Sequence, residues 1–244
     1  MKRRRFLEVS GVLGASAALP HRWSERLPTP DSGPVDGITV LFQGDSITDC
    51  GRDRKGTAPN AAAALGNGYP LLIASRLLAR RAEAGYRFFN RGVSGNTVPD
   101  CDARWQADTL DLAPDVLSIL IGVNDYWHTL NGSYQGTADD YEHQLTALLA
   151  RTRTALPNVR LVMLEPFTLK TGVITDSWFP AFDERRKIAK RVSDAAGATF
   201  LATQDLFDRA SREAPPSYWA SDGVHPTAAG HGAIADLWME TVAL

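Results

Sequence analysis

The sequence has little cysteine, little net charge and no long apolar run. Its 244 residues contain two cysteines, Cys50 and Cys101, and neither belongs to a C-x-x-C pair, which argues against a set of zinc ligands. The formal net charge of -2 gives no electrostatic reason to expect nucleic acid or an anionic membrane surface as a partner. Internal repeats and low-complexity tracts are also absent. What remains is a chain of suitable length for one sizeable α/β domain.

The N-terminus has the pattern of an export signal. The segment MKRRRFLEVSGVLGASAAL has a basic start, an apolar middle from Val9 to Leu19 and small residues suited to cleavage. This middle is shorter than the roughly 20 residues that a membrane-spanning helix needs. The segment RRRFLE resembles the twin-arginine export signal. We therefore predict a signal peptide over residues 1–19, a Pro- and Ser-rich linker over 20–35 and a folded domain over 36–244. The mature protein is expected in the periplasm, in the cell envelope or outside the cell, without stable membrane insertion.

From Ile38 onward, apolar runs short enough for buried strands alternate with stretches of helical spacing. The predicted strands are Ile38–Gln43, Tyr86–Asn90, Asp115–Gly122, Val159–Pro166 and Ala198–Ala202. The predicted helices are Tyr69–Gly85, Thr137–Pro157, Phe179–Gly197 and Ala228–Leu244. This alternation predicts an α/β fold, a three-layer α/β/α sandwich around a five-stranded parallel sheet. In such sheets ligands bind beyond the carboxyl ends of the strands, which is where chemistry is expected.

Polar segments follow three of the predicted strands, and a fourth precedes the last helix. They are Gly44-Asp45-Ser46, NRGVSGNT (Asn90–Thr97), Gly122-Val123-Asn124-Asp125 and SDGVHPT (Ser221–Thr227). Each alone is a common turn or a chance pattern. Because the carboxyl ends of parallel strands share one rim of the sheet, we expect a serine, a glycine turn, an asparagine and an Asp/His pair to gather there. These are the parts that an acyl-transfer site requires.

In this hypothesis Ser46 is a nucleophile. A serine hydroxyl needs an adjacent base, for which His225 is the candidate, and Asp222 is placed to orient the ring and stabilise the imidazolium. The oxyanion hole, which holds the negative oxygen of a tetrahedral intermediate, is predicted from the N–H groups of Ser46 and Gly95 and the amide of Asn124. Glycine at position 95 lets the backbone approach a substrate closely.

A metal-dependent alternative uses other residues of the same rim. Asp222, His225 and His231 could together hold a metal ion. That arrangement would leave Ser46 and Asn124 without a role. We therefore expect no metal and no cofactor.

With these segments identified, the sequence resembles the SGNH (GDSL-type) hydrolase superfamily. The likeness extends from Ile38 to about Trp238 and rests on four blocks: Gly44-Asp45-Ser46-Ile47, the Gly95 turn, Gly122-x-Asn124-Asp125 and Asp222-x-x-His225-Pro226. It implies a flavodoxin-like fold, serine esterase activity and the residue roles given above.

Longer segments are similar to bacterial acetylxylan esterases of this superfamily, among them GDSITDCGR, NRGVSGNTV and HPTAAGH. That similarity implies removal of O-acetyl groups from xylan or xylo-oligosaccharides. Those relatives tend to carry Trp just before the catalytic Asp, whereas this chain has Ser221 there and Trp219 two residues earlier. The preference for acetyl over longer acyl groups therefore stays open.

The substrate side of the rim is predicted to be aromatic. Tyr126, Trp127, Tyr218 and Trp219 either stack on sugar rings or pack the rim. The expected partner is a small-molecule or oligosaccharide ester.

Two other functions remain open: a lysophospholipase or broad acyl hydrolase with the same residues, and a carbohydrate-binding protein on a retired hydrolase scaffold. The absence of a long apolar loop near the motifs argues against lipid. The presence of both Ser46 and His225 argues against a retired enzyme. A homo-oligomer is possible, and so is a disulfide between Cys50 and Cys101, since both follow motifs of the rim.

Overall fold

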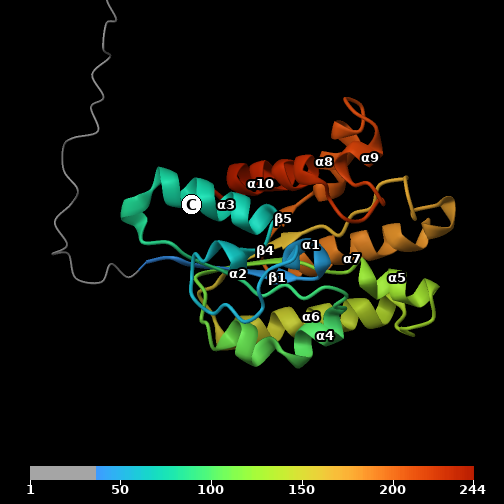
Figure 1. Cartoon of the computed structure of the whole chain (residues 1–244). Helices are drawn as coiled ribbons and strands as arrows, with labels where there is room; N and C mark the ends of the chain where they lie inside the picture. Colours follow the sequence, from blue (N-terminus) through green and yellow to red (C-terminus); the bar gives the residue numbers. More distant parts are fainter. Residues whose placement is uncertain (1–36) are drawn as a thin grey trace, which may run out of the picture. The chain divides into compact units, whose positions relative to one another are not determined.

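The computed structural model describes residues 37–244, so the predicted signal peptide and linker lie outside the described residues. Five strands form one parallel sheet in the order β2-β1-β3-β4-β5 (Figure 1). Their bounds are β1 (Thr39–Gly44), β2 (Arg87–Asn90), β3 (Val116–Leu120), β4 (Arg160–Leu164) and β5 (Thr199–Leu201). The predicted α/β fold with a five-stranded parallel sheet is confirmed.

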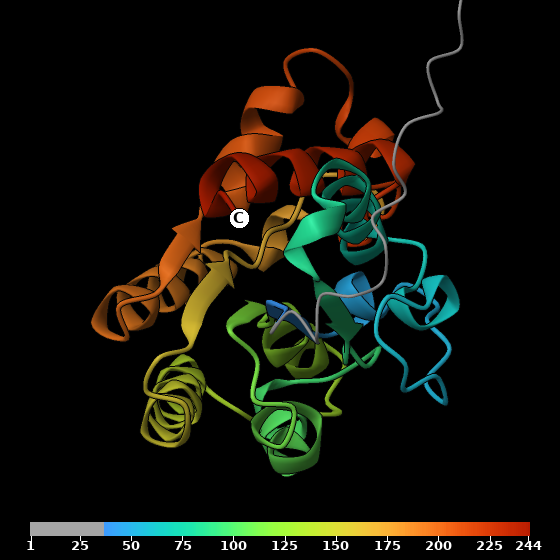
Figure 2. The same cartoon turned by 90° about the vertical axis from the view of Figure 1, so that its left-hand side faces the viewer.

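Two apolar layers enclose the sheet because successive strand residues point to opposite faces. On β1, Val40 and Phe42 pack with α3 (Tyr69–Arg80) and α10 (Ala228–Val242). Leu41 joins the other core, which is formed with α4 (Val98–Ala103), α6 (Ala138–Ala155) and α7 (Ala181–Ala195). Figure 2 shows α3 and α10 on one side of the sheet and α4 and α6 on the other.

Several short helices lie between the longer elements, and these were not predicted. They are α1 (Ser46–Asp49), α2 (Ala62–Leu65), α5 (Asn124–Leu130), α8 (Thr203–Ala210) and α9 (Pro216–Trp219), with single turns at η1 (Ala82–Ala84), η2 (Gln106–Leu110) and η3 (Asp176–Trp178). Elements of one or two turns are too short to show an apolar period in the sequence. Two of them, α1 and α5, begin within a few residues of the ends of β1 and β3.

The four long helices begin within two residues of the predicted positions. Thr137 caps α6, because its hydroxyl accepts a hydrogen bond from the N–H of Asp140 at 3.1 Å. Thr227 caps α10 in the same way through the N–H of Gly230 at 3.3 Å. Over residues 37–244, no helix has both the length and the apolar character needed to cross a membrane.

Candidate functional site

The end of β1 turns sharply into α1, and this turn presents Ser46. Gly44 has φ +151°, and a Cβ added to it would lie 2.2 Å from the carbonyl oxygen of Leu120. Only glycine therefore fits at this point. Oδ1 of Asp45 accepts a hydrogen bond from the N–H of Ile47 at 3.0 Å and caps α1. As a result Ser46, the first residue of α1, stands half-buried beyond the carboxyl end of β1.

Three side chains from distant parts of the sequence form a continuous hydrogen-bonded line. The Oγ of Ser46 lies 2.9 Å from Nε2 of His225. Nδ1 of His225 lies 2.6 Å from Oδ2 of Asp222. The other carboxylate oxygen of Asp222 accepts hydrogen bonds from the N–H groups of Val224 and His225, at 2.9 and 2.7 Å. The loop that holds His225 is therefore folded around the carboxylate of Asp222.

The ionisation state of Asp222 determines which nitrogen of His225 carries a proton. Burial works to raise the pKa of Asp222, but the hydrogen bonds from the ring and backbone of His225 and from Val224 outweigh it and hold the pKa below its ordinary value. An ionised Asp222 can only accept, so Nδ1 of His225 carries the proton and donates it. The lone pair of Nε2 then faces the Ser46 hydroxyl and can take its proton.

The three predicted oxyanion donors lie around the ends of neighbouring strands. Asn124 is buried, and its Nδ2 donates one hydrogen bond to the carbonyl of Asn96 at 3.1 Å, so its second N–H has no acceptor in the described part of the chain. Gly95 has φ +85° with open space beside it. Within residues 37–244, the N–H groups of Ser46 and Gly95 donate to no other residue. Donors of this kind are available for a developing negative charge.

Hydrogen bonds join the Gly95 loop to β1 and α1. The N–H of Val93 donates to the carbonyl of Gly44 at 3.0 Å. Asp49 accepts from both the N–H and the hydroxyl of Ser94, at 2.9 Å each, and it also forms an ion pair with Arg54. Although burial alone would raise it, the pKa of Asp49 is held below its ordinary value by Arg54 and Ser94. The ionised side chain of Asp49 thus links the end of α1 to the Gly95 loop.

Two further carboxyl groups lie buried under the site. Oδ1 of Asp125 accepts from the N–H of Val98 at 2.9 Å, while Oδ2 of Asp125 and Oδ2 of Asp45 have no partner in the described part of the chain. Burial raises the pKa of each group to about 7. A buried carboxyl with an unpaired oxygen favours its neutral form.

Sequence reasoning missed the roles of Asp49 and Asn90, although both occur in the quoted segments. Nδ2 of Asn90 donates to the carbonyls of Thr48 and Leu65, at 2.6 and 2.9 Å, and its Oδ1 accepts from the N–H of Gly92. The signal available was an Asp or Asn two residues before a glycine, as in Asp49-Cys50-Gly51 and Asn90-Arg91-Gly92. Such residues commonly hold loops through their side chains.

The four predicted aromatic residues lie in different surroundings. The ring of Trp127 is half-buried, with its centroid 6.1 Å from that of His225. Tyr126 is buried, and the guanidinium of Arg185 lies over its ring at 4.7 Å, which favours the packing alternative for this residue. The indole N–H of Trp219 donates to backbone carbonyls near the end of α8, and the exposed ring of Tyr218 packs edge-on against Trp219.

The cysteines and His231 lie beside the site without joining it. Cys50 and Cys101 are free thiols. One ring nitrogen of His231 accepts from the N–H of Tyr69 at 3.2 Å, and the other lies 3.4 Å from Sγ of Cys50. The ring of His231 is buried and both of its nitrogens contact neighbouring residues, so His231 is a packing residue. Across residues 37–244 no group of three or more His, Cys, Asp or Glu side chains is arranged to hold a metal ion.

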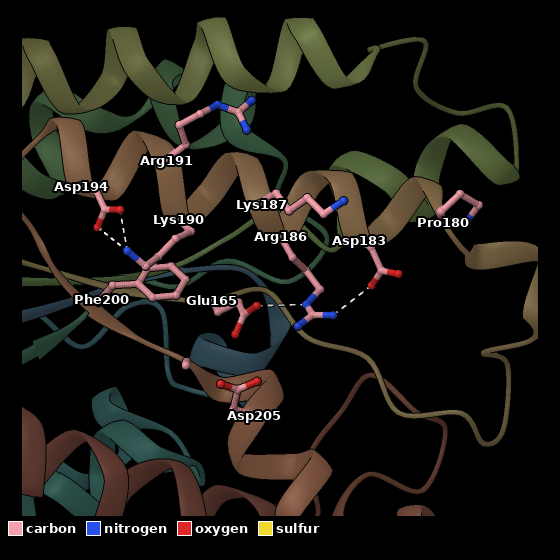
Figure 3. Close-up of a pocket in the computed structure, with 11 residues that line it drawn as sticks. Glu165, Pro180, Asp183, Arg186, Lys187, Lys190, Arg191, Asp194, Phe200 and Asp205 are labelled. Atoms are coloured by element: carbon pink, nitrogen blue, oxygen red, sulfur yellow. Dashed lines mark hydrogen bonds and ion pairs between the residues drawn. The ribbon is translucent and has the colours of Figure 1, made fainter.

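A separate hollow of about 670 Å³ lies beside α7, and Figure 3 shows the residues that line it. Neither Ser46, Asp222 nor His225 contributes to its walls. Its central charges pair with one another, because Arg186 bridges Glu165 and Asp183 at 3.0 and 2.9 Å. Because these charged groups already pair with one another, the hollow gives no reason to assign a ligand to it. The candidate functional site therefore remains the one formed by Ser46, Asp222 and His225.

Comparisons with known proteins fit this geometry. The model of the GDSL-like lipase/acylhydrolase family matches residues 42–233. The acetylxylan esterase of Geobacillus stearothermophilus is 33% identical over 210 residues, which make up 84% of this chain and 94% of that relative.

Solved structures give the same result. The crystal structure of Axe2, the acetylxylan esterase from Geobacillus stearothermophilus, superposes with a TM-score of 0.76 at 34% identity and covers 85% of this chain and 95% of its own. Further structures are catalytic mutants of that enzyme with a serine or a histidine changed to alanine. A protein from Parabacteroides merdae, named for its resemblance to GDSL lipases, gives a TM-score of 0.83 at 48% identity and covers 84% and 95%.

Proposed function

The chain belongs to the GDSL-like lipase/acylhydrolase family of ester hydrolases, and we propose that it removes O-acetyl groups from carbohydrate through an acyl-enzyme on Ser46. The observation that carries the mechanism is the line from Ser46 through His225 to Asp222, with contacts of 2.9 and 2.6 Å. A hydroxyl, an imidazole and a carboxylate in this order are what a serine nucleophile requires.

In the first half of the reaction, Oγ of Ser46 attacks the ester carbonyl carbon as its proton passes to Nε2 of His225. The electron pair of the carbonyl bond moves to oxygen, and the N–H groups of Ser46, Gly95 and Asn124 hold the resulting charge. Asp222 stabilises the imidazolium. When the tetrahedral intermediate collapses, the bond to the sugar oxygen breaks and His225 returns its proton to that oxygen. The sugar alcohol leaves and the acetyl group stays on Ser46.

In the second half, water replaces the alcohol. His225 takes a proton from the water as its oxygen attacks the acyl carbon. The second tetrahedral intermediate uses the same donors. Its collapse breaks the bond to Oγ of Ser46, which regains a proton from His225, and acetate is released. Every proton is carried by His225, so the cycle needs no added cofactor.

The carbohydrate part of the proposal is supported by the relatives and by the surroundings of His225. The compared enzyme Axe2 of Geobacillus stearothermophilus is an acetylxylan esterase, also described as an acetyl-xylooligosaccharide esterase. The half-buried ring of Trp127 stands beside His225, where an aromatic face could pack against a sugar ring. Ser221, where relatives tend to have Trp, is exposed and adds no wall next to Asp222.

A comparison of acyl chains tests this substrate class. We expect acetyl esters to be hydrolysed faster than octanoyl and palmitoyl esters, and acetate to be released from acetylated xylo-oligosaccharides. The Ser46→Ala variant is the control and should release no acetate above background. Faster hydrolysis of the long acyl esters would contradict the carbohydrate proposal and favour a lipid-directed hydrolase.

We also propose export through the twin-arginine pathway, which the RRRFLE segment supports. Changing Arg3 and Arg4 to Lys in the full chain should keep the esterase activity in the cytoplasm of a host that has this pathway. The unchanged chain should deliver its activity to the periplasm or the medium. Equal export of both would contradict the proposal.

A further inference from the structure

Arg104 makes an unusual number of contacts for a residue with no assigned role. It follows α4, and its side chain is 19% exposed. Nε donates to Oδ1 of Asn96 at 2.8 Å, and Nη2 donates to the carbonyl of Gly44 at 3.3 Å. Nη1 contacts the carbonyl of Arg91 at 2.7 Å and Oε1 of Gln43 at 2.9 Å. One guanidinium thus contacts the end of β1 and two residues, Arg91 and Asn96, of the loop that follows β2.

These contacts converge on the proposed oxyanion hole. Gly44 lies two residues before Ser46, so its carbonyl fixes the turn that carries the Ser46 N–H. Asn96 directly follows Gly95, and its carbonyl accepts from the side-chain amide of Asn124 at 3.1 Å. Arg104 therefore contacts the segments that supply the Ser46 and Gly95 donors, and it is linked to the third donor, Asn124, through Asn96.

We propose that Arg104 is a positioning residue that fixes the three oxyanion donors relative to one another. The inference rests on the oxyanion assignment under the proposed function. Arg104 does not touch the substrate. It acts through the carbonyl of Gly44 and the side chain of Asn96.

Arginine suits this position for a geometric reason. Its planar guanidinium presents five N–H donors in a fixed fork, whereas lysine offers three donors at one point. Asp108 holds the group through Oδ2 at 3.0 Å from Nη1, and Sγ of Cys101 lies 3.4 Å from Nη2. Lysine could keep the charge opposite Asp108 but could not reach both Gly44 and Asn96.

The expected effect is on the chemical step. Oxyanion donors stabilise the transition state only when they are preorganised, and a misplacement of about 1 Å can lower a rate about 10²-fold. Substrate binding uses other parts of the rim. Loss of Arg104 should therefore lower kcat much more than it changes KM.

The experiment compares Arg104→Lys and Arg104→Met with the unchanged chain on a small chromogenic acetyl ester. Active sites are titrated with an organophosphonate ester so that kcat is expressed per reactive Ser46. We expect kcat per titrated site to fall about 10- to 100-fold in both variants, with KM changed less than about threefold. A purely structural role would lower the number of titratable sites and the melting temperature, but not kcat per site. Unchanged kcat per site would overturn the inference.

Two further variants keep the test decisive. Arg151→Met is the matched control, because Arg151 also contacts the α4 region, through Asp102 at 3.0 Å, but lies far more exposed and contacts none of the oxyanion segments. It should leave kcat unchanged. Asn96→Ala removes one contact of Arg104 without altering the arginine, and kcat should fall several-fold even if the Arg104 variants fold poorly.

Asn124→Ala, measured in parallel, separates two kinds of failure. If this variant loses activity while the Arg104 and Asn96 variants do not, the positioning role alone is overturned. If Asn124→Ala keeps full activity, the oxyanion assignment itself fails and the inference fails with it.

Discussion

The two halves of the site are held in place differently. The donors at Ser46, Gly95 and Asn124 follow three neighbouring strands and lie among buried polar groups at the carboxyl ends of these strands. The pair Asp222 and His225 lies in the loop between α9 and α10, with side chains 34% and 43% exposed. We call these the buried half and the exposed half.

Backbone hydrogen bonds hold the loop of the exposed half in place. The N–H of Leu169 donates to the carbonyl of Gly223 at 2.8 Å, and the N–H of Val173 donates to the carbonyl of Asp222 at 3.0 Å. Gly223 has φ +89°, and a Cβ there would lie 2.5 Å from two carbonyl oxygens. The comparison teaches that charge stabilisation is built on fixed dipoles, whereas proton transfer uses a partly exposed ring held between Asp222 and Ser46.

The largest effect is expected from changing Ser46 or His225, the two residues through which the halves are in contact. Ser46→Ala and His225→Ala should each lower kcat/KM for a chromogenic acetyl ester by about 10⁴- to 10⁶-fold, because neither residue works without the other. The double variant should be no less active than the worse single variant. Initial rates at matched enzyme concentration measure all three. A double variant whose loss equals the product of the single losses would contradict a shared step.

The next effect concerns the buried half alone. Asn124→Ala removes one oxyanion donor and should lower kcat by about 10²- to 10³-fold with little change in KM. Steady-state rates on the same ester provide the measurement. A variant with normal kcat and a raised KM would show that Asn124 binds the ground state instead.

A smaller loss is expected in the exposed half. Asp222→Ala removes the carboxylate, but water can reach Nδ1 of His225 because the site is partly exposed. We expect kcat to fall by about 10²-fold, the low end of the range for acid–base catalysis. A loss well above that of Asn124→Ala would mean that the exposed half depends on its carboxylate more strongly than its solvation suggests.

The last prediction concerns stability and its dependence on pH, not the reaction rate. Burial raises the pKa of Asp125 from its ordinary value of 3.8 to about 7. Between about pH 4 and 7 the folded protein keeps a proton that the unfolded chain has released, so this group lowers the free energy of unfolding as the pH rises. Asp125→Asn keeps the acceptor for Val98 and removes the titration.

Urea unfolding at several pH values tests this prediction. The stability of Asp125→Asn relative to the unchanged chain should grow between pH 4 and 7 and level off above it. Each unit of pKa difference corresponds to about 1.4 kcal/mol, so the gain should reach a few kcal/mol. A gain that shrinks as the pH rises would contradict a neutral buried carboxyl.

Much of this arrangement could be predicted from the sequence. The strand-ending positions of Gly44 and Asn90, and of Gly122 two residues beyond β3, follow from apolar runs that stop at turn residues. A parallel sheet places such ends on one rim. That rule predicts that Ser46 and His225 lie close together although they are 179 positions apart in the sequence. The structure places them in hydrogen-bond contact.

Other features depend on three-dimensional contacts that no local pattern encodes. Tyr126 and Trp127 are adjacent aromatic residues, yet α5 turns one into the core under Arg185 and leaves the other beside His225. Arg104 resembles any arginine of a charged helix end until Gly44 and Asn96 are folded around it. Periodicity reports which face is apolar, but not which polar partner a long side chain will reach.

The most direct test of the account is labelling by an organophosphonate ester, followed by peptide mapping with mass spectrometry. The account predicts one adduct per chain, on Ser46, that forms far more slowly in His225→Ala and at an unchanged rate in Arg151→Met. An adduct on another residue, or an unlabelled protein that still hydrolyses acetyl esters, would contradict the central claim that Ser46 is the nucleophile activated by His225.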